Sequence, residues 1–170
     1  MPKPTSGTFP PYFSRYIDKV TEDDLQAAFD TQHEVIEIFF SSITEEKAGL
    51  AYAPGKWTLK ELLQHIIDAE RIFAYRALCI ARKETKNLPG FDEDSYAANS
   101  EANRRTWHGL VEEIKTVRRS TKLLFENFSE ATLNNAGLSN DHPATVNAIG
   151  FIMIGHLTHH VGIIKERYLV

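Results

Sequence analysis

The chain has 170 residues, 42% of them hydrophobic and 25% charged, with a formal net charge of −4. This length and composition fit a single globular domain over residues 1–170. The negative charge gives no electrostatic basis for binding nucleic acid or an anionic membrane. Because Cys79 is the one cysteine, the chain cannot form an internal disulfide, and we expect a buried thiol in a cytoplasmic protein.

The N-terminal residues 1–20 carry four prolines, followed by the apolar side chains of Tyr12, Phe13, Tyr16 and Ile17. Proline disfavours regular structure, so we expect an extended arm whose aromatic side chains pack on the domain. The segment lacks the apolar core of a secretory signal. The longest uncharged apolar stretch, residues 148–157, is too short to span a bilayer, so we expect no membrane association.

The first predicted helix starts after Thr21 and Asp24, which resemble a capping box, and continues to about Ser42. Its apolar stripe has the spacing of a helix face, with Leu25, Phe29, Gln32, Ile36, Phe39/Phe40 and Ile43. His33 lies beside this stripe, next to the polar Gln32, and we interpret it as a surface residue.

The second predicted helix begins after Thr58, which forms a capping box with Glu61, and runs to about Lys83. Trp57 is placed to pack on Leu62 as a hydrophobic staple. His65 lies on the edge of the inward face of this helix. Taken alone, a histidine there is more often a core residue than a metal ligand.

Residues 86–100 are acidic, contain proline and glycine, and are long for a tight turn, so they predict a crossover connection. A third apolar stripe follows from Trp107 to Phe128, and we interpret its basic residues as a solvated face (Lys115, Arg118, Arg119 and Lys122). Residues 134–143 predict a loop, and residues 145–168 a last helix. Four amphipathic segments without a convincing strand predict an all-α four-helix bundle.

The last helix carries two histidines, His156 and His160, on a face that is otherwise apolar. Residues four apart on a helix have Cβ atoms roughly 5–6 Å apart, so both rings can reach one cation. The alternative is a pair of hydrogen-bonded core histidines. His65 is the candidate third ligand, because three imidazoles packed together without a cation leave polar nitrogens unpaired. His159 points to a neighbouring face and is interpreted as a group beside the site or at an interface, not as a ligand.

The sequence HLTHH lacks the glutamate that HExxH metalloproteases use as general base. Three neutral imidazoles leave coordination positions open, which favours catalysis over structural support. Such a cation acidifies water, holds a thiol as thiolate, or polarises a carbonyl. Imidazole ligands suit zinc or nickel first, with iron or copper as alternatives.

No general base is assigned by spacing. Asp68 either orients the His65 ring or is simply exposed, and Glu61 serves as a cap. Glu70 and Arg71 are interpreted as members of surface ion pairs.

Three stretches, WTLKELLQHIIDAERIFAYRAL, LPGFDEDSYA and IGHLTHHVGIIKERY, resemble the DinB/YfiT-like family of metal-dependent proteins. The resemblance covers most of the chain and implies an up-down-down-up four-helix bundle with a long crossover between its second and third helices. It also implies a divalent cation held by His65, His156 and His160, and a homodimer. Some members resemble S-transferases that use a low-molecular-weight thiol, and others are named as hydrolases.

Three hypotheses follow for the function. The first is a metalloenzyme acting on a small-molecule substrate, either as a thiol-dependent S-transferase or as a hydrolase. The second is a stress-related bundle that binds a metal or ligand without turnover, for which a closed fourth coordination position would be the signature. The third is a purely structural helical bundle.

Overall fold

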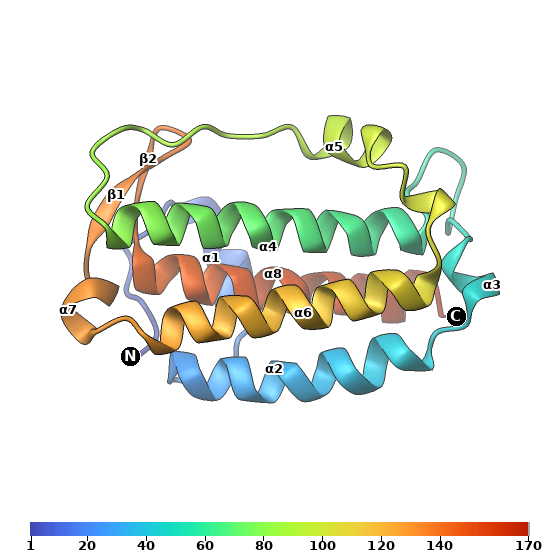
Figure 1. Ribbon diagram of the computed structural model, residues 1–170, viewed down its shortest axis with the longest axis horizontal. Coiled ribbons are helices and arrows are strands. Elements are labelled where there is room, and N and C mark those ends of the chain that lie inside the picture. Colours follow the sequence, from blue (N-terminus) through green and yellow to red (C-terminus); the bar gives the residue numbers. More distant parts are fainter. Residues whose placement is uncertain (170) are drawn as a thin grey trace.

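The computed structural model describes residues 1–169, and most of them lie in helices. Four long helices run side by side (Figure 1): α2 (Leu25–Phe39), α4 (Leu59–Ala81), α6 (Trp107–Glu126) and α8 (Val146–Arg167). α2 and α8 run in one direction and α4 and α6 in the other, so the topology is up-down-down-up (Figure 1). The predicted four-helix bundle is confirmed.

The crossover between α4 and α6 makes this topology possible, because two parallel neighbouring helices need a connection as long as themselves. It passes along the outside of the bundle and carries the short helix α5 (Glu93–Asn99) (Figure 1). α4 packs against α6 and α8, and α2 packs against the same two helices from the opposite side. α4 and α8 are therefore neighbours, and the histidines of both helices can meet.

Side-chain caps set where the long helices begin. Thr58 and Glu61 form the predicted capping box at the start of α4, and Thr145 caps α8 by accepting from the Ala148 N–H at 3.2 Å. The predicted capping box at the first helix is wrong. Asp24 is itself the N-cap residue, and its carboxylate accepts from two backbone N–H groups of the first turn.

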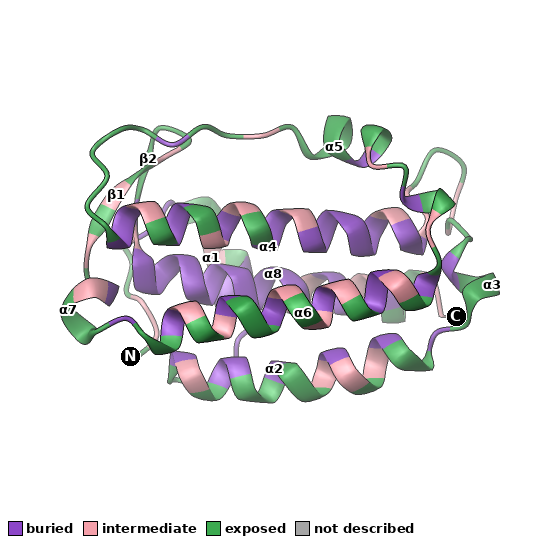
Figure 2. Cartoon of the chain, in the orientation of Figure 1, coloured by how far each residue is buried: buried purple, intermediate pink, exposed green. Residues whose placement is uncertain are grey.

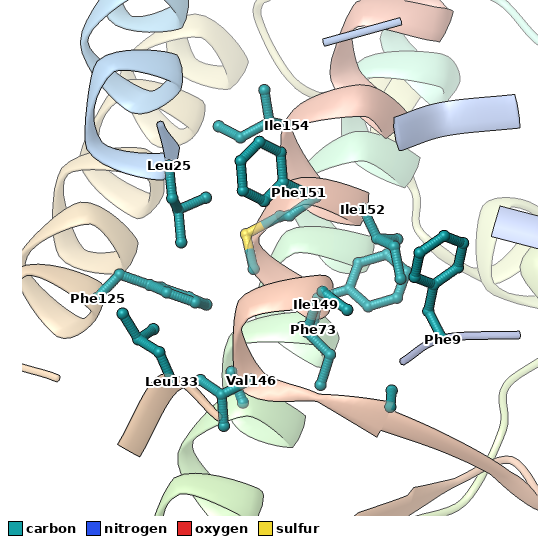
Figure 3. Packing of buried hydrophobic residues seen from close by; sticks show 14 of the residues in the cluster. Phe9, Leu25, Phe73, Phe125, Leu133, Val146, Ile149, Phe151, Ile152 and Ile154 are labelled. Carbon is teal, nitrogen blue, oxygen red and sulfur yellow. The ribbon is translucent and has the colours of Figure 1, made fainter. Parts of the chain in front are cut away.

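The core has two apolar clusters, one at each end of the bundle, with a polar layer between them. Figure 3 shows the first cluster, in which Phe151, Ile152 and Ile154 of α8 lie among side chains of α2, α6 and the N-terminal arm. Buried residues continue along most of α4 and α8 (Figure 2), and Gln32, Glu70 and Arg118 between the two clusters are buried as well. The layer therefore consists of buried polar side chains, which must satisfy one another.

A buried ion pair occupies this polar layer. Arg118 of α6 donates from Nε and Nη2 to the two carboxylate oxygens of Glu70 on α4, at 2.8 and 2.7 Å. It also donates to Gln32 of α2, whose amide donates to the Ile154 carbonyl of α8 at 2.7 Å. The network joins all four long helices. The prediction that Arg118 and Glu70 lie on the surface is wrong, because both side chains are 2% exposed.

The N-terminal arm is not simply extended as predicted. After Pro10 it forms a 3₁₀ turn (Pro11–Phe13) and the single-turn helix α1 (Ser14–Ile17), because proline fits the first position of a helical turn. α1 packs on α8. A Cβ atom at Gly155 would lie 2.0 Å from the Tyr16 carbonyl oxygen. The backbone of α1 can therefore approach α8 this closely only because residue 155 is a glycine.

Three further segments differ from the predictions. Residues 134–143, predicted as a loop, contribute to a two-stranded hairpin of β1 (Ala136–Ser139) and β2 (His142–Thr145). Short turns of helix follow α2 and α6: 3₁₀ residues Phe40–Ser42, α3 (Glu45–Ala48) and α7 (Glu130–Leu133). Cys79, predicted to be buried, is partly exposed.

α8 is long and apolar enough, by length and composition alone, to cross a membrane. However, 78% of its most apolar stretch is buried inside the protein. The arm covers one side of α8 while α2 and α4 cover others, so its apolar character is that of a central core helix.

Candidate metal centre

Three histidines meet between α4 and α8. Nε2 of His156 lies 3.1 Å from Nε2 of His65 and 3.1 Å from Nε2 of His160. The three potential ligand atoms all lie within 4.8 Å of one another. His65 is 8% exposed, His156 7% and His160 9%. The structure thus brings together all three of the histidines that the sequence singled out, and His33 is exposed as expected.

Hydrogen bonding among the rings does not explain these distances. The Nε2 atom of a neutral imidazole carries either one N–H or one lone pair. His156 Nε2 can therefore make one good hydrogen bond, to His65 or to His160, but not to both. A cation explains them directly. Two imidazole nitrogens, each about 2.0–2.1 Å from one tetrahedral ion, lie roughly 3.3 Å apart. The donor set therefore fits a single divalent ion.

Burial keeps these imidazoles in the form that a metal requires. Desolvation lowers the pKa of His65 to about 4, against the opposing effect of the Glu93 and Asp94 carboxylates. Burial, reinforced by neighbouring imidazoles, also holds the pKa of His156 and of His160 well below the usual range. All three rings are thus neutral at pH 7, with a lone pair free to coordinate.

The cluster opens into a cavity of about 320 Å³. Aromatic rings surround the histidines: Trp57 lies 5.0 Å from His65, centroid to centroid, and Tyr16 and Phe73 lie 5.4 and 6.1 Å from His156. Trp57, placed in the sequence as a staple, therefore also packs on the candidate ligand. The surroundings are apolar enough to strengthen electrostatic interactions inside the cavity.

The described residues supply no fourth protein ligand to the cluster, because no carboxylate, thiolate or further imidazole joins the group of three. Asp68 accepts a hydrogen bond from Gln64 at 2.8 Å and does not orient His65. The Nδ1 atom of His160 is buried and has no hydrogen-bond partner among residues 1–169. The open side of the cluster faces the cavity, which matches a site with free coordination positions.

His159 lines the same cavity without joining the group of three. Its ring lies 5.1 Å from that of His160 and 5.4 Å from that of Tyr16. Burial and the nearby Lys19 and Arg15 lower its pKa, although Glu166 opposes this. His159 is therefore placed beside the candidate metal position as a neutral imidazole.

Sequence reasoning missed several residues of the cavity, because they come from segments that were predicted to be a simple arm, crossover and loop. The arm contributes Arg15 and Tyr16, the crossover contributes Glu93, and the hairpin turn contributes Asn140. The basic residue Arg76 of α4 also lines it. One signal was available for Arg76, since it lies on the same predicted edge of the second helix as His65.

Comparison with known proteins agrees with this arrangement. A family model described as the DinB superfamily matches residues 28–164. The chain belongs to the DinB superfamily. It is 24% identical over 89 residues to an Oceanobacillus iheyensis protein named "Putative metal-dependent hydrolase OB0413", and the match covers 51% of each chain. The chain thus spans about half the length of this curated relative.

The structure is also similar to that of YfiT from Bacillus subtilis, described as "a probable metal-dependent hydrolase with an unusual four-helix bundle topology". The TM-score is 0.65 at 16% sequence identity, with 96% of this chain and 90% of YfiT covered. This likeness establishes the fold. The predicted family is confirmed, while the assignment of His65, His156 and His160 as metal ligands stays a prediction.

Proposed function

We propose that this DinB superfamily protein is a metal-dependent enzyme that acts on a small molecule, with one divalent ion held by His65, His156 and His160. The observation that supports it most is the convergence of three neutral Nε2 atoms at the base of an open cavity. Zinc or nickel fits this all-imidazole donor set best. A cation bound there lowers the pKa of a water or thiol that it binds and polarises a carbonyl oxygen.

The surrounding residues have separable roles in this proposal. Trp57 and Phe73 exclude bulk water from the histidines, which strengthens electrostatic interactions with a bound substrate. His159 is the group placed to accept a proton, because it is neutral at pH 7 and lines the cavity. Tyr16 packs against both His156 and His159 and orients the two rings.

Hydrolysis is the first candidate reaction, and the name of the Oceanobacillus relative supports it. The nucleophile would then be water, with His159 as the proton acceptor. This version predicts that an ester or amide is cleaved at the same rate with or without an added thiol.

Thiol transfer is the second candidate, and a specific observation favours it. His160 and Trp57 line a second cavity of about 360 Å³, on the side of Tyr52 and Tyr168. Two cavities that share His160 and Trp57 suit a reaction that joins two molecules, a low-molecular-weight thiol and an electrophile. In this version no general base is needed for water, and His159→Gln should leave the rate within a few fold.

Activity assays separate the alternatives. Protein stripped with a chelator and reloaded with zinc or nickel would be tested on a model ester and on a model electrophile with a small thiol. Metal-dependent ester cleavage at a rate that the thiol does not change supports hydrolysis. Metal-dependent consumption of the electrophile that occurs only when the thiol is present supports transfer. Turnover of neither substrate by the loaded protein would favour a non-catalytic metal-binding bundle.

A further inference from the structure

We infer that the cavity binds a substrate with an anionic group, a carboxylate, and that Arg76 of α4 receives this group. The inference deepens the proposed function, because it assigns a chemical class to the molecule that reaches the three histidines. The inference depends on two features of Arg76: its side chain is buried without a carboxylate partner among the described residues, and it lies on the same face of α4 as His65.

Arg76 is a buried cation without a counter-charge. It is 6% exposed, and no carboxylate of the described residues lies within 4.0 Å of it. Within the described part of the chain it makes one hydrogen bond, from Nη2 to the Pro89 carbonyl at 2.7 Å, and its guanidinium lies 5.7 Å from the centre of the Phe73 ring. Burial alone lowers its pKa. A guanidinium has five N–H donors, so most of the donors of Arg76 are free.

Arg118 provides the comparison, because it is a buried arginine with a structural role. Arg118 is 1% exposed, and Glu70 neutralises it through two hydrogen bonds at 2.8 and 2.7 Å. A buried charge without a counter-charge is unfavourable, and among the described residues the chain supplies a counter-charge to Arg118 but not to Arg76. A ligand that carries the missing negative charge accounts for the difference.

The position of Arg76 relative to the histidines fits a single extended ligand. Arg76 follows His65 by eleven residues, or three turns, so the two share one face of α4 with Cα atoms about 16 Å apart. Ala69 and Phe73 lie between them on this face, and all four residues line the same cavity. The small side chain of Ala69 leaves room along the wall. A molecule lying along α4 therefore has its reacting end at the histidines and its carboxylate at Arg76.

The hairpin turn adds a second polar group at this end of the cavity. Asn140 has a left-handed backbone with φ of 51°, and its side chain lines both the main cavity and the smaller one beside it, as Arg76 does. A Cβ atom at Gly90 would lie 2.2 Å from the Asn140 side-chain oxygen. The crossover therefore has a glycine at the position where the Asn140 side chain packs against it. The N–H₂ group of an amide is a suitable donor to a carboxylate.

The remaining charges are compatible with this direction of binding. Arg15 lines the cavity, has no carboxylate partner among the described residues, and stacks on the Tyr12 ring at 3.8 Å. Glu93 also lines the cavity, and its negative charge acts on His65, at the opposite end from the anionic group. The charge of Arg15 acts on His156 and His160, so of the two arginines that line the cavity Arg76 is the one at the end away from the histidines.

The inference is tested by comparing linear alkanoates with the matching neutral alkanamides, using calorimetry on metal-free protein. The same comparison on zinc-loaded protein uses linear ω-mercaptoalkanoates of increasing length and their amides. The variants are Arg76→Gln, Arg76→Lys and, as a matched control, Arg82→Gln. Arg82 is a helix-end arginine of the same segment that is exposed and does not line the cavity.

We expect the wild type to bind the acid about tenfold or more tightly than the amide, as charge-assisted hydrogen bonds to a buried guanidinium predict. Arg76→Gln should remove this preference, Arg76→Lys should retain part of it, and Arg82→Gln should leave it unchanged. Equal binding of acid and amide by the wild type would overturn the inference, and so would a preference that survives in Arg76→Gln. If Arg76→Gln does not fold, the wild-type comparison and Arg76→Lys still decide.

The measurements on metal-free and on zinc-loaded protein test this inference and the proposed function separately. If metal-free protein prefers acids but the thiol group does not increase the affinity of zinc-loaded protein, the role of Arg76 is supported. The same result contradicts metal-dependent chemistry on such molecules. An affinity optimum at one chain length in the zinc-loaded protein supports both.

Discussion

Replacing Gly155 by alanine tests whether the close approach of α1 to α8 shapes the site. The new Cβ atom would meet the Tyr16 carbonyl oxygen at 2.0 Å, and the carbonyl carbon at 2.4 Å. Both are backbone atoms, so no side-chain rotation relieves the clash, and α1 must move. Overpacking of this kind costs about 1–3 kcal/mol, and complete release of α1 would also expose Ile17, whose burial contributes about 1.5–3 kcal/mol. The helix-propensity gain from alanine, about 1 kcal/mol, offsets only part of this.

Gly162→Ala is the matched control, because it lies in the same helix and, apart from its own helix backbone and chain neighbours, no described residue lies within 4 Å of its added Cβ. Thermal and urea unfolding should show Gly155→Ala less stable than Gly162→Ala by about 2 kcal/mol, or roughly 4–8 °C in Tm for a chain of this size. Displaced Tyr16 should also alter the imidazole signals of His156 and His159 in NMR spectra. Equal stabilisation of the two variants would show that α1 does not approach α8 as described.

Three further outcomes follow from the structure. Arg118→Met should destabilise the protein by about 3–5 kcal/mol, because it leaves Glu70 buried and unpaired, whereas adding Glu70→Leu should recover most of that loss in denaturant titrations. Burial raises the pKa of Asp68, so the folded state binds its proton more tightly than the unfolded state. Stability therefore falls as pH rises from the ordinary value of 3.8 through the raised pKa, and Asp68→Asn should abolish this fall and be more stable at pH 7. Because Trp57 stacks near His65, adding nickel or copper should quench its fluorescence, and Trp57→Phe should lose that response.

Much of the fold followed from local patterns. The long helices were predictable because each has an apolar stripe of helical period, and because the capping box at Thr58 and Glu61 is a local signal. The last helix is predicted over residues 145–168, and the structure has it over Val146–Arg167. The hairpin was missed, because β1 and β2 are four residues each and depend on pairing with one another.

The polar layer shows why the rest was harder. Arg118 lies among Lys115, Arg119 and Lys122, so its composition indicates a solvated face, and only the partner Glu70 on a parallel helix makes its burial tolerable. That partner is 48 residues away. Pairing across such a distance is set by tertiary structure and leaves no trace in helical periodicity.

The candidate site divides in the same way. His156 and His160 share a helix face by spacing alone, and His65 was placed inward by its own helix, so these three could be named. The walls of the cavity could not, since Arg15, Glu93 and Asn140 come from the arm, the crossover and the hairpin turn. Those segments have no periodicity from which a side-chain direction follows.

Metal content measured on protein made without a histidine tag tests the central claim most directly. Elemental analysis should find about one equivalent of divalent metal in the wild type and in His33→Ala, where the lost histidine is exposed. His156→Ala and His160→Ala should lose it, and His65→Ala should lose or greatly weaken it. Full metal content in the two α8 variants, or a wild type that takes up no zinc or nickel after purification, would contradict the account.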